Sequence, residues 1–404
     1  MSDALFQTID DIARPTTVLA RLDLNSPVED GVVKDNRRFA RHAETVTDLV
    51  NAGHRVAVLA HQGRPGRADC VPLEQHARIL ADHIDRPVEY CAETVGPAAE
   101  SAVSRLDNGE VLVLENVRMH EAELTDRSPE QHAASDFVQS LATLGTVYVG
   151  DAYSTAHRSH ASIVGLPLAM DQAVAGRVMA AEYLANSSIQ SRTFDGHVTM
   201  VLGGTKADDL IRVIRGVDET VDEFLLGGVI GELALRAMGH DVGYDVGDME
   251  LFDPLWSEHA SLIRSVLDQY GDRIHLPVDL AYASGDNGRQ EVAVTGIAKT
   301  EAYLDVGQET IAGYADIIDE SAAVFVKGAL GVFEDERFSD GTVGVLEAIA
   351  NTEAYSVVGG GDTSRAIDLY GLDPAAFDHI SIAGGAYVHA LAGEELPGVT
   401  VLKS

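Results

Sequence analysis

Lysine is scarce in this sequence: only five of its 404 residues are lysine, at positions 34, 206, 299, 327 and 403. Asp and Glu number 64 against 29 for Lys plus Arg, which gives a formal net charge of −35. Such a charge repels nucleic acid and anionic lipid, so we expect neither as a partner. Because the carboxylates are spread along the chain rather than grouped in a tail, they indicate a solvated surface adapted to high salt.

Three further absences narrow the class of protein. With Cys70 and Cys91 as the only cysteines, the sequence offers no disulfide framework and no cysteine spacing typical of a metal site. No uninterrupted apolar run reaches the length of about 18 residues that a transmembrane helix needs. The N-terminal segment MSDALFQTIDDIARP has no basic start followed by an apolar stretch, so a signal peptide is not expected. These absences favour a cytoplasmic protein.

Short apolar runs alternate with helix-like segments along the whole chain. Val, Ile and Leu dominate the runs without period-two alternation, which is typical of strands buried on both faces. The runs are Val18–Leu24, Val56–Ala60, Val111–Leu114, Val147–Val149, Val198–Leu202, Phe224–Leu226, Ile274–Leu276, Ala322–Val326, Ser356–Val358 and His379–Ile382. Helical patterns such as Ala40–Ala52, Leu73–Ile84 and Ala207–Val217 lie between them. The pattern predicts an α/β protein with parallel sheets covered by helices.

Ten or more strands in one open sheet would be unusual, so we expect two Rossmann-like domains. The segment Gly165-Leu166-Pro167 precedes a helical pattern that reaches Leu184 and can join the domains as a hinge helix. We therefore predict a first domain over residues 1–172 and a second over residues 173–385.

Ligands of open parallel sheets bind beyond the carboxyl ends of the strands, so the residues after each run carry the functional information. In the first half these segments are Arg21 to Asn25, His61 to Arg64, Glu115 to Arg118 and Asp151 to Arg158, and Arg38 opens the first helix. Arginine suits a small phosphate or carboxylate because its planar fork donates two parallel hydrogen bonds. Arg38, Arg64 and Arg118 are therefore candidate anion ligands.

The same residues have structural interpretations. A single arginine is commonly a surface ion pair and a single histidine a packed side chain, but their recurrence at four strand ends favours a site. Arg21 and Asp151 stay open, because a buried pair that braces the loops would look the same. His157 and His160 are interpreted as structural.

Glycine replaces arginine at the strand ends of the second half. The segments are Gly203-Gly204-Thr205-Lys206, Gly227-Gly228, Gly328-Ala329-Leu330-Gly331, Gly359-Gly360-Gly361-Asp362-Thr363 and Gly384-Gly385-Ala386. Glycine permits close approach of the backbone to a ligand, and the helix N-termini that follow offer N–H groups to phosphate. Lys206 is placed to contact a transferred phosphate, and Asp362 is a candidate ligand for Mg²⁺ beside a nucleotide.

Two other classes of protein would share some of these features. An oxidoreductase on a doubly wound fold would share the GGGDT segment, but neither a redox cysteine pair nor a second dinucleotide fingerprint is present. A non-enzymatic acidic protein that binds Ca²⁺ would explain the charge, but the sequence has no EF-hand pattern. The P-loop motif is also absent.

Several motifs in order resemble those of phosphoglycerate kinases, over essentially the whole chain. In the first half they are ARLDLNSP, HQGRP, LENVRMH and GDAYSTAHRSHAS. In the second half they are VLGGTKADD, LPVD, KGALGVFE, VVGGGDTS and SIAGGAYVHALAGEELPGV. With the acidic composition, the resemblance points to a salt-adapted, archaeal-like lineage.

The resemblance implies reversible phosphoryl transfer between 1,3-bisphosphoglycerate and ADP, giving 3-phosphoglycerate and ATP, with Mg²⁺ as cofactor. It implies a monomer in which a C-terminal tail, here residues 386–404, returns to the first domain. The substrate acid would be contacted by Asp23, Asn25, Arg38, His61, Arg64, Arg118 and Arg158. The nucleotide would be contacted by Lys206, Lys327, Glu334, Gly360, Gly361, Asp362 and Thr363, with Glu334 on the ribose and Asp362 near the metal. Arg38 and Lys206 would stabilise charge on the moving phosphoryl group, and closure of a hinge would align the substrates in line.

Departures from the family pattern affect the nucleotide half most. A second lysine that often follows the one at 206 by four residues is replaced by Leu210. Conversely, Lys327 stands where an asparagine is usual. We hypothesise that Lys327 supplies the phosphate charge that Leu210 cannot. Two smaller departures occur. Ser154 differs from the residue usual in the family at that position, and the segment Ser381 to Ala386 lacks one hydroxyl and one glycine of the family's motif.

Overall fold

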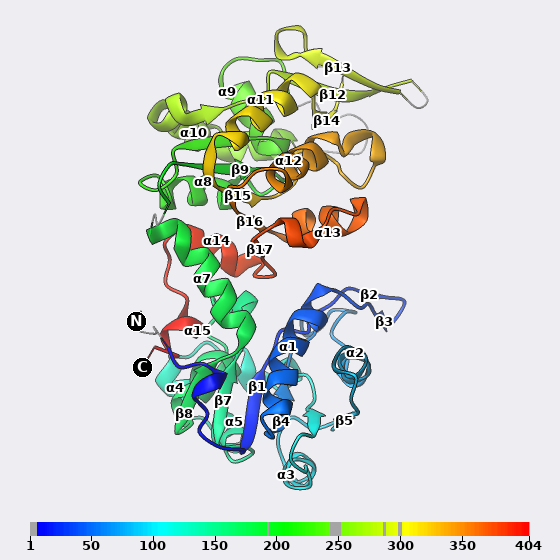
Figure 1. The fold of residues 1–404 in the computed structure, drawn as a ribbon, viewed down its shortest axis with the longest axis vertical. Helices are drawn as coiled ribbons and strands as arrows, with labels where there is room; N and C mark the ends of the chain where they lie inside the picture. Colours follow the sequence, from blue (N-terminus) through cyan, green and yellow to red (C-terminus); the bar gives the residue numbers. More distant parts are fainter. Residues whose placement is uncertain (1–5, 192–193, 243–251, 286–287, 298–300, 404) are drawn as a thin grey trace. The chain divides into compact units, whose positions relative to one another are not determined.

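The computed structural model describes residues 6–191, 194–242, 252–285, 288–297 and 301–403 (Figure 1). The chain forms two compact units, one of Met1–Leu184 with Glu395–Ser404 and one of Ala185–Glu394. The boundary falls within α7 (Arg177–Ser191), a helix whose sequence continues without a break from one unit into the other. The expected boundary, between residues 172 and 173, lies earlier and inside strand β8 (Gln172–Ala175).

A six-stranded parallel sheet forms the centre of the first unit. Its strands follow the order β5 (Val88–Tyr90), β6 (Val111–Val113), β4 (Arg55–Leu59), β1 (Thr17–Arg21), β7 (Val147–Gly150) and β8. Its helices are α1 (Arg37–Asn51), α2 (Glu74–Ile84), α3 (Pro97–Ser104), α4 (Pro129–Ala133), α5 (Asp136–Ala142) and α6 (Leu166–Ala169). A short ribbon of β2 (Val28–Glu29) and β3 (Val32–Val33) precedes α1. The Val and Leu side chains of β1 and β4 are buried on both faces, as expected for a parallel sheet whose crossover helices cover its faces.

Helix α1 places its first turn at the carboxyl edge of this sheet. The side chain of Asn36 caps the helix by accepting a hydrogen bond from the backbone N–H of Arg38 at 2.8 Å. Phe39, Val46 and Leu49 recur on one face of α1 and pack into the core. The cap and the buried face together fix the position from which the Arg38 side chain leaves the helix.

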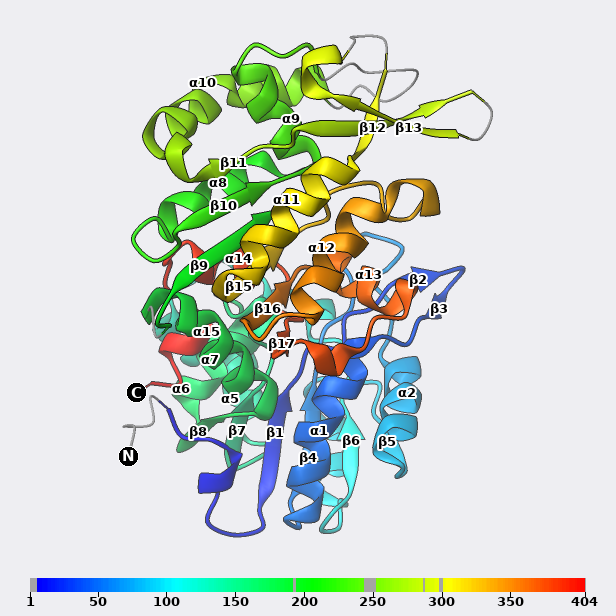
Figure 2. The same cartoon turned by 45° about the horizontal axis from the view of Figure 1, so that its top comes forward.

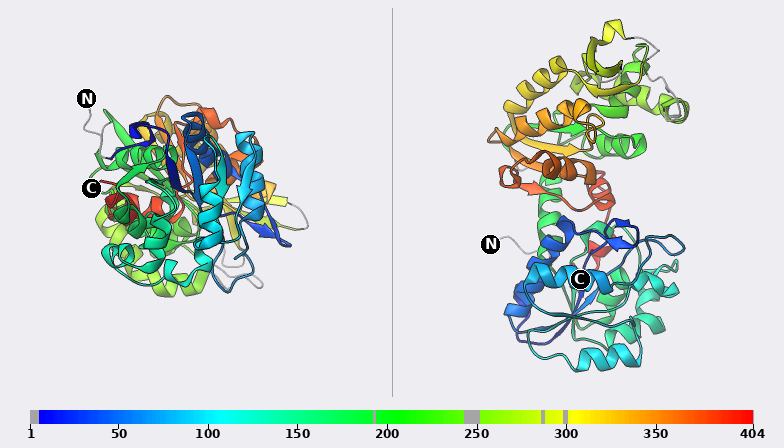
Figure 3. Two further views of the ribbon diagram at one scale, coloured as in Figure 1. Left: turned by 90° about the horizontal axis from the view of Figure 1, so that it is seen from below. Right: turned by 90° about the vertical axis from the view of Figure 1, so that its right-hand side faces the viewer.

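The second unit has a six-stranded parallel sheet in the order β11 (Ile274–His275), β10 (Glu223–Leu226), β9 (His197–Leu202), β15 (Ser321–Lys327), β16 (Tyr355–Gly359) and β17 (His379–Ile380). In chain order this is 3-2-1-4-5-6, the order of dinucleotide-binding folds. Its helices are α8 (Ala207–Gly216), α9 (Gly228–Ala237), α10 (Phe252–Tyr270), α11 (Gln308–Asp319), α12 (Asp340–Ala350), α13 (Gly361–Tyr370) and α14 (Gly385–Leu391). Figures 2 and 3 show α11, α12 and α13 on one side of this sheet and α8, α9, α10 and α14 on the other. The expected fold class, two α/β units with helix-covered parallel sheets, is confirmed.

A three-stranded antiparallel sheet was not expected. It consists of β13 (Gly288–Ala293), β12 (Asp279–Ser284) and β14 (Tyr303–Val306) in that order. Asp279 ends the LPVD motif and is buried, and its carboxylate accepts hydrogen bonds from the backbone N–H groups of Glu309 and Thr310 at the start of α11. The motif therefore connects this small sheet to a helix N-terminus.

All ten strands expected from the apolar runs are present, with ends that differ by a few residues. The runs missed β5, β8 and the antiparallel strands because these are short or partly exposed, so their residues are not uniformly apolar. The last ten residues, with the short helix α15 (Pro397–Thr400), belong to the first unit, where the N–H of Gly398 donates to the carbonyl of Ala156. Residues 386–394 stay with the second unit. Among the described helices, none is both long and apolar enough to cross a membrane.

Candidate active site

In the first unit, polar side chains gather beyond the carboxyl ends of β1, β4, β6 and β7. Asp23 and Asn25 follow β1, and His61 and Arg64 follow β4. Arg118 lies in a 3-10 turn (Val117–Met119) after β6, and Arg158 follows the turn after β7. Because the four strands are parallel neighbours, these side chains share one edge of the sheet.

Asp23 organises the part of the site nearest β1. Its buried carboxylate faces Arg38 Nη1 at 3.3 Å, and it accepts hydrogen bonds from the N–H of Asn25 at 3.0 Å and from the Ser154 hydroxyl. Burial alone would raise the pKa of Asp23, but the charge of Arg38 and the nearby His61 and Ser154 hold that pKa well below its usual range. Asp23 is therefore ionised and directs Arg38, whose Nη1 also donates to the carbonyl of Asn25 at 2.8 Å.

His61 is neutral in this setting. Its ring is buried, and burial, together with the charges of Arg21, Arg118 and Arg38, holds its pKa well below the usual value despite the opposing charge of Asp23. Arg21 Nη2 lies 3.2 Å from Nδ1, and because arginine only donates, Nδ1 must accept. The ring proton is then on Nε2, which faces Asp23 Oδ1 at 3.9 Å.

Several cations of the first unit lie close enough to disfavour one another's charge. Burial and the charges of Arg21 and Arg158 lower the pKa of Arg118 to about 10, and burial and Arg64 lower the pKa of Arg158. Arg118 is 8% exposed and its Nη1 donates to the carbonyl of Gly63 at 2.6 Å, while its Nε has no hydrogen-bond partner among the residues that the structure describes. A bound polyanion would relieve this repulsion and accept the free donor.

Two residues that the sequence left open are structural. The Arg21 side chain is fully buried and donates to the Ser162 hydroxyl at 2.9 Å and to the carbonyl of Leu22. Asp151 is also fully buried; it lies 2.8 Å from His42 Nδ1 and accepts from the N–H groups of Val178 and Met179 at 2.9 and 3.1 Å. Asp151 therefore fixes the start of α7.

The histidines after β7 fit the structural interpretation as well. Burial and the neighbouring Arg118 and Arg21 lower the pKa of His160 to about 3, so this ring is neutral. A neutral ring adds no charge to an anion site. His157 is half-buried beside it.

In the second unit, the glycine loops meet where the strand order reverses, between β9 and β15. A Cβ on Gly203 would lie 2.2 Å from the carbonyl oxygen of Ala329, and a Cβ on Gly328 would lie 2.2 Å from the carbonyl oxygen of Gly203. Only glycine permits this contact between the two loops. The backbones after β9 and β15 therefore form one continuous floor at the topological switch point.

Two lysines and two aspartates lie around a cavity of about 260 Å³ above this floor. The cavity is lined by Gly203, Gly204, Thr205, Lys206, Asp209, Lys327, Gly328, Gly360, Gly361, Asp362, Gly384, Gly385 and Val388. Burial lowers the pKa of Lys327, and Lys206 lowers it further, while Asp209 and Asp362 oppose the shift. The structure thus brings Lys206, Lys327 and Asp362 together, as expected. The side chain of Leu210 lies outside the described part of the chain.

The N-terminus of α13 faces the same cavity. Gly360 precedes the helix with φ +106°, a conformation that favours glycine, and it turns the chain so that the first N–H groups of α13 are free of helical partners. Thr363 points inward: its side chain is buried and its hydroxyl donates to the carbonyl of Gly359 at 2.7 Å. Thr363 can therefore bind a ligand through its backbone N–H and not through its hydroxyl.

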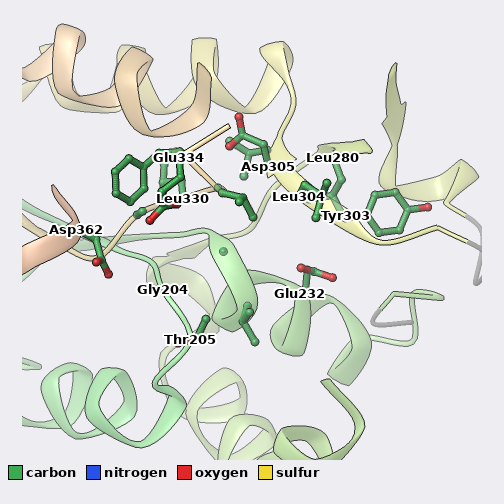
Figure 4. Close-up of a pocket in the computed structure, with 17 residues that line it drawn as sticks. Gly204, Thr205, Glu232, Leu280, Tyr303, Leu304, Asp305, Leu330, Glu334 and Asp362 are labelled. Atoms are coloured by element: carbon green, nitrogen blue, oxygen red, sulfur yellow. The ribbon is translucent and has the colours of Figure 1, made fainter. Parts of the chain in front are cut away.

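An apolar cavity of about 240 Å³ adjoins the first and shares Gly204, Thr205 and Asp362 with it (Figure 4). Leu280, Tyr303, Leu304, Leu330 and Val332 contribute to its walls, and Glu334 lies at its edge, 3.4 Å from Arg365. The sequence motifs identified Glu334 but missed the wall from β12 and β14 and missed Glu232 on α9.

Comparison with known proteins agrees with this geometry. The family model described as phosphoglycerate kinase matches residues 9–394. A phosphoglycerate kinase of Halorubrum lacusprofundi is 61% identical over 99% of this chain and 98% of its own, and one of Haloarcula marismortui is 60% identical over 98% and 99%. These relatives are haloarchaeal, which confirms the expected salt-adapted lineage.

Solved structures agree in fold. The crystal structure of phosphoglycerate kinase from Pyrococcus horikoshii matches with a TM-score of 0.90 and 32% identity over 98% of both chains. The enzyme from Coxiella burnetii matches with a TM-score of 0.80 and 28% identity, also over 98% of both chains. The chain belongs to the phosphoglycerate kinase family, the glycolytic enzymes that transfer a phosphoryl group reversibly between 1,3-bisphosphoglycerate and ADP.

Proposed function

We propose that the first unit binds the acid substrate and the second unit binds the nucleotide. The observation that carries this division is the difference between the two carboxyl edges: one presents several partly buried arginines and the other presents glycine loops with two lysines. A phosphate and a carboxylate on a three-carbon acid match the arginines Arg38, Arg64, Arg118 and Arg158. Asp23, Asn25 and His61 would orient these arginines and the substrate hydroxyl.

The nucleotide would occupy the two adjoining cavities of the second unit. Its phosphates suit the polar cavity, where Lys206, Lys327 and the free N–H groups from Gly360 to Thr363 converge. Its base suits the apolar cavity, and its ribose would lie near Glu334 at the edge. Because the two cavities share three lining residues, together they would form one elongated site.

Asp362 is the candidate ligand for Mg²⁺. Its carboxylate is exposed, lines both cavities and acts electrostatically on Lys327, so it lies where nucleotide phosphates would meet the metal. An oxygen ligand of this kind, with water and phosphate oxygens, matches the preference of Mg²⁺. When bound, the ion would neutralise phosphate charge and orient the transferred group.

The protein has little covalent chemistry to perform in this reaction. The acceptor is already an anion, a carboxylate or a nucleotide phosphate, so no general base is required. Arg38 from the first unit and Lys206 from the second would stabilise the charge on the transferred group as it passes in line between donor and acceptor. Because the two substrates are held by different units, the units would have to close around them for transfer, which would also exclude water.

Lys327 is proposed to replace the missing second lysine of the family pattern. Replacing Lys327 with Ala should raise the KM for ADP and ATP about tenfold or more, because a partly buried charge beside phosphate contributes about 1.5–3 kcal/mol. Lys327→Asn restores the residue usual in the family and should not rescue binding. Steady-state kinetics in concentrated KCl measures both variants, and an unchanged nucleotide KM in Lys327→Ala would contradict the proposal.

We further propose that the enzyme works as a cytoplasmic monomer that binds neither nucleic acid nor membrane. The support is its acidity, since a net charge of −35 opposes both kinds of partner and also self-association. Sedimentation at several KCl concentrations should give the mass of a single 43.0 kDa chain. A dimer mass that persists in concentrated KCl would show the proposal to be wrong.

A further inference from the structure

Glu232 is a carboxyl group inside an apolar cavity that the mechanism does not use. It lies in the second turn of α9 and lines the cavity with Val229 from its own helix and Leu304 from β14. Figure 4 shows its carboxyl directed from α9 into the cavity, toward the side of Tyr303 and Leu304. It forms no hydrogen bond or ion pair with any other residue in the part of the chain that the structure describes.

Glu232 is half-buried, and the part of its carboxyl that is withdrawn from water gains no partner among the described residues, which costs free energy. Burial raises the pKa of Glu232 to about 8, so the carboxyl is mostly neutral at pH 7. A neutral carboxyl offers one hydrogen-bond donor and one acceptor side by side. The cavity therefore contains a hydrogen-bond donor and an acceptor that are both available to a ligand.

The charged groups around Glu232 neither form a hydrogen bond with its carboxyl nor stabilise its charge. Asp305, Glu334 and Asp362 line the same cavity and are themselves acidic, and Tyr303 is the other titratable group in its wall. Asp305 is paired with Arg289 at 2.9 Å. One turn along α9, Arg236 pairs with Asp253 at 2.8 Å and lies over the rings of Phe252 and Trp256. No cation among these described residues favours ionisation of Glu232.

Adenine has the complementary pattern, because its exocyclic amino group is a donor next to a ring nitrogen that accepts. We propose that Glu232 recognises the adenine base: its carbonyl oxygen accepts a hydrogen bond from the amino group, and its hydroxyl donates to the neighbouring ring nitrogen. The inference rests on the proposed nucleotide site and adds a specificity-determining residue to it. It assigns the choice of the adenine base to one residue of this chain.

Two substitutions separate recognition from packing. Glu232→Gln keeps an acceptor and a donor in the same shape, whereas Glu232→Leu keeps the bulk and removes both. The probe is purine riboside triphosphate, which lacks the amino group of ATP. Glu320→Leu, at an exposed glutamate after α11 outside the cavity, is the matched control.

We expect the unmodified enzyme, the Glu320→Leu control and Glu232→Gln to prefer ATP over purine riboside triphosphate about tenfold in kcat/KM, the range of one buried hydrogen bond. Glu232→Leu should use the two nucleotides within about twofold of each other. A preference for ATP that survives in Glu232→Leu, or that is missing from the unmodified enzyme, would overturn the proposal.

The pH dependence gives a second readout that packing would not produce. The pKa of Glu232 is raised, so its proton is present below about 8 and is lost as the pH rises through that value. The kcat/KM for ATP of the unmodified enzyme, divided by that of Glu232→Gln at the same pH, should therefore fall between pH 7 and 9. Division by the glutamine variant cancels the other titrating groups, and a constant ratio would contradict the proposal.

Failure of base recognition can be told apart from failure of the proposed nucleotide site. If Glu232→Leu binds Mg-ADP and treats the two nucleotides as the unmodified enzyme does, Glu232 does not recognise the base although the site is correct. If Lys206→Ala and Lys327→Ala both leave Mg-ADP binding unchanged by calorimetry, the site itself is wrong and the proposal for Glu232 falls with it.

Discussion

Replacing Arg38 with Ala should lower kcat at least about 10²–10³-fold, the loss seen when one preorganised donor to transition-state charge is removed. Arg38 is the arginine that Asp23 holds directly, through a 3.3 Å ion pair with a carboxylate whose pKa is depressed. Its remaining donors have no partner among the described residues, so they can meet charge that develops on the transferred group. The KM for ATP should change little, because the nucleotide is proposed to bind the other unit.

Arg41→Ala is the matched control for this prediction. Arg41 lies on the same helix, where it pairs with Glu44 at 3.4 Å, and it is not among the proposed site residues. Steady-state kinetics in concentrated KCl should give it a kcat close to that of the unmodified enzyme. A near-normal kcat in Arg38→Ala, or an equal loss in Arg41→Ala, would remove Arg38 from the chemistry.

Lys206→Ala should also lower kcat by about 10²-fold or more, and Lys206→Arg should recover only part of the loss. Lys206 precedes α8 at the floor formed by the glycine loops, and its charge acts on Lys327 across the phosphate cavity. A lysine is a compact point charge, whereas the planar fork of arginine spreads its charge and directs its donors differently.

Lys34→Ala is the control for the second prediction, since Lys34 is an exposed lysine paired with Glu29 at 2.9 Å in the first unit. The kcat of Lys34→Ala should equal that of the unmodified enzyme. Rapid-quench measurement of a single turnover would locate the defect of Lys206→Ala in the transfer step rather than in product release. A normal single-turnover rate in Lys206→Ala would contradict its proposed role.

The candidate site was visible in the sequence because of a property of parallel sheets. Strands buried on both faces must be uniformly apolar, so their ends are easily found, and their carboxyl ends all meet at one edge. Residues as distant in the chain as Asp23 and Arg118 could therefore be assigned to one site from the sequence alone. In the structure, Asp23 lies close enough to Arg118 for its charge to act on the pKa of Arg118.

The sequence could not distinguish ligand-binding residues from structural residues at the carboxyl edge of the sheet. Arg21 ends β1 and Arg118 follows β6. Only the fold buries Arg21 completely against Ser162, while it leaves Nε of Arg118 without a partner in the described part of the chain. Thr363 is a similar case, because its motif suggests a ligand contact whereas its hydroxyl is used by Gly359. The direction of a side chain depends on packing between elements far apart in the chain.

Glu232 was missed for a related reason. A single glutamate on a helix is usually exposed, and nothing in the local pattern of α9 shows that this turn faces β12 and β14. The predicted boundary between residues 172 and 173 differs from the division between the compact units, which falls within α7, because this helix continues across that division without a Gly or Pro to mark it.

The central claim, that each unit binds a different substrate, is tested most directly by calorimetry with Arg38→Ala and Lys206→Ala. Each variant is titrated in concentrated KCl with 3-phosphoglycerate alone and with Mg-ADP alone. The account predicts that Arg38→Ala weakens 3-phosphoglycerate binding and leaves Mg-ADP binding unchanged, and that Lys206→Ala does the reverse. If either variant weakened both ligands equally, or if the pattern were exchanged, the division of substrates between the units would be contradicted.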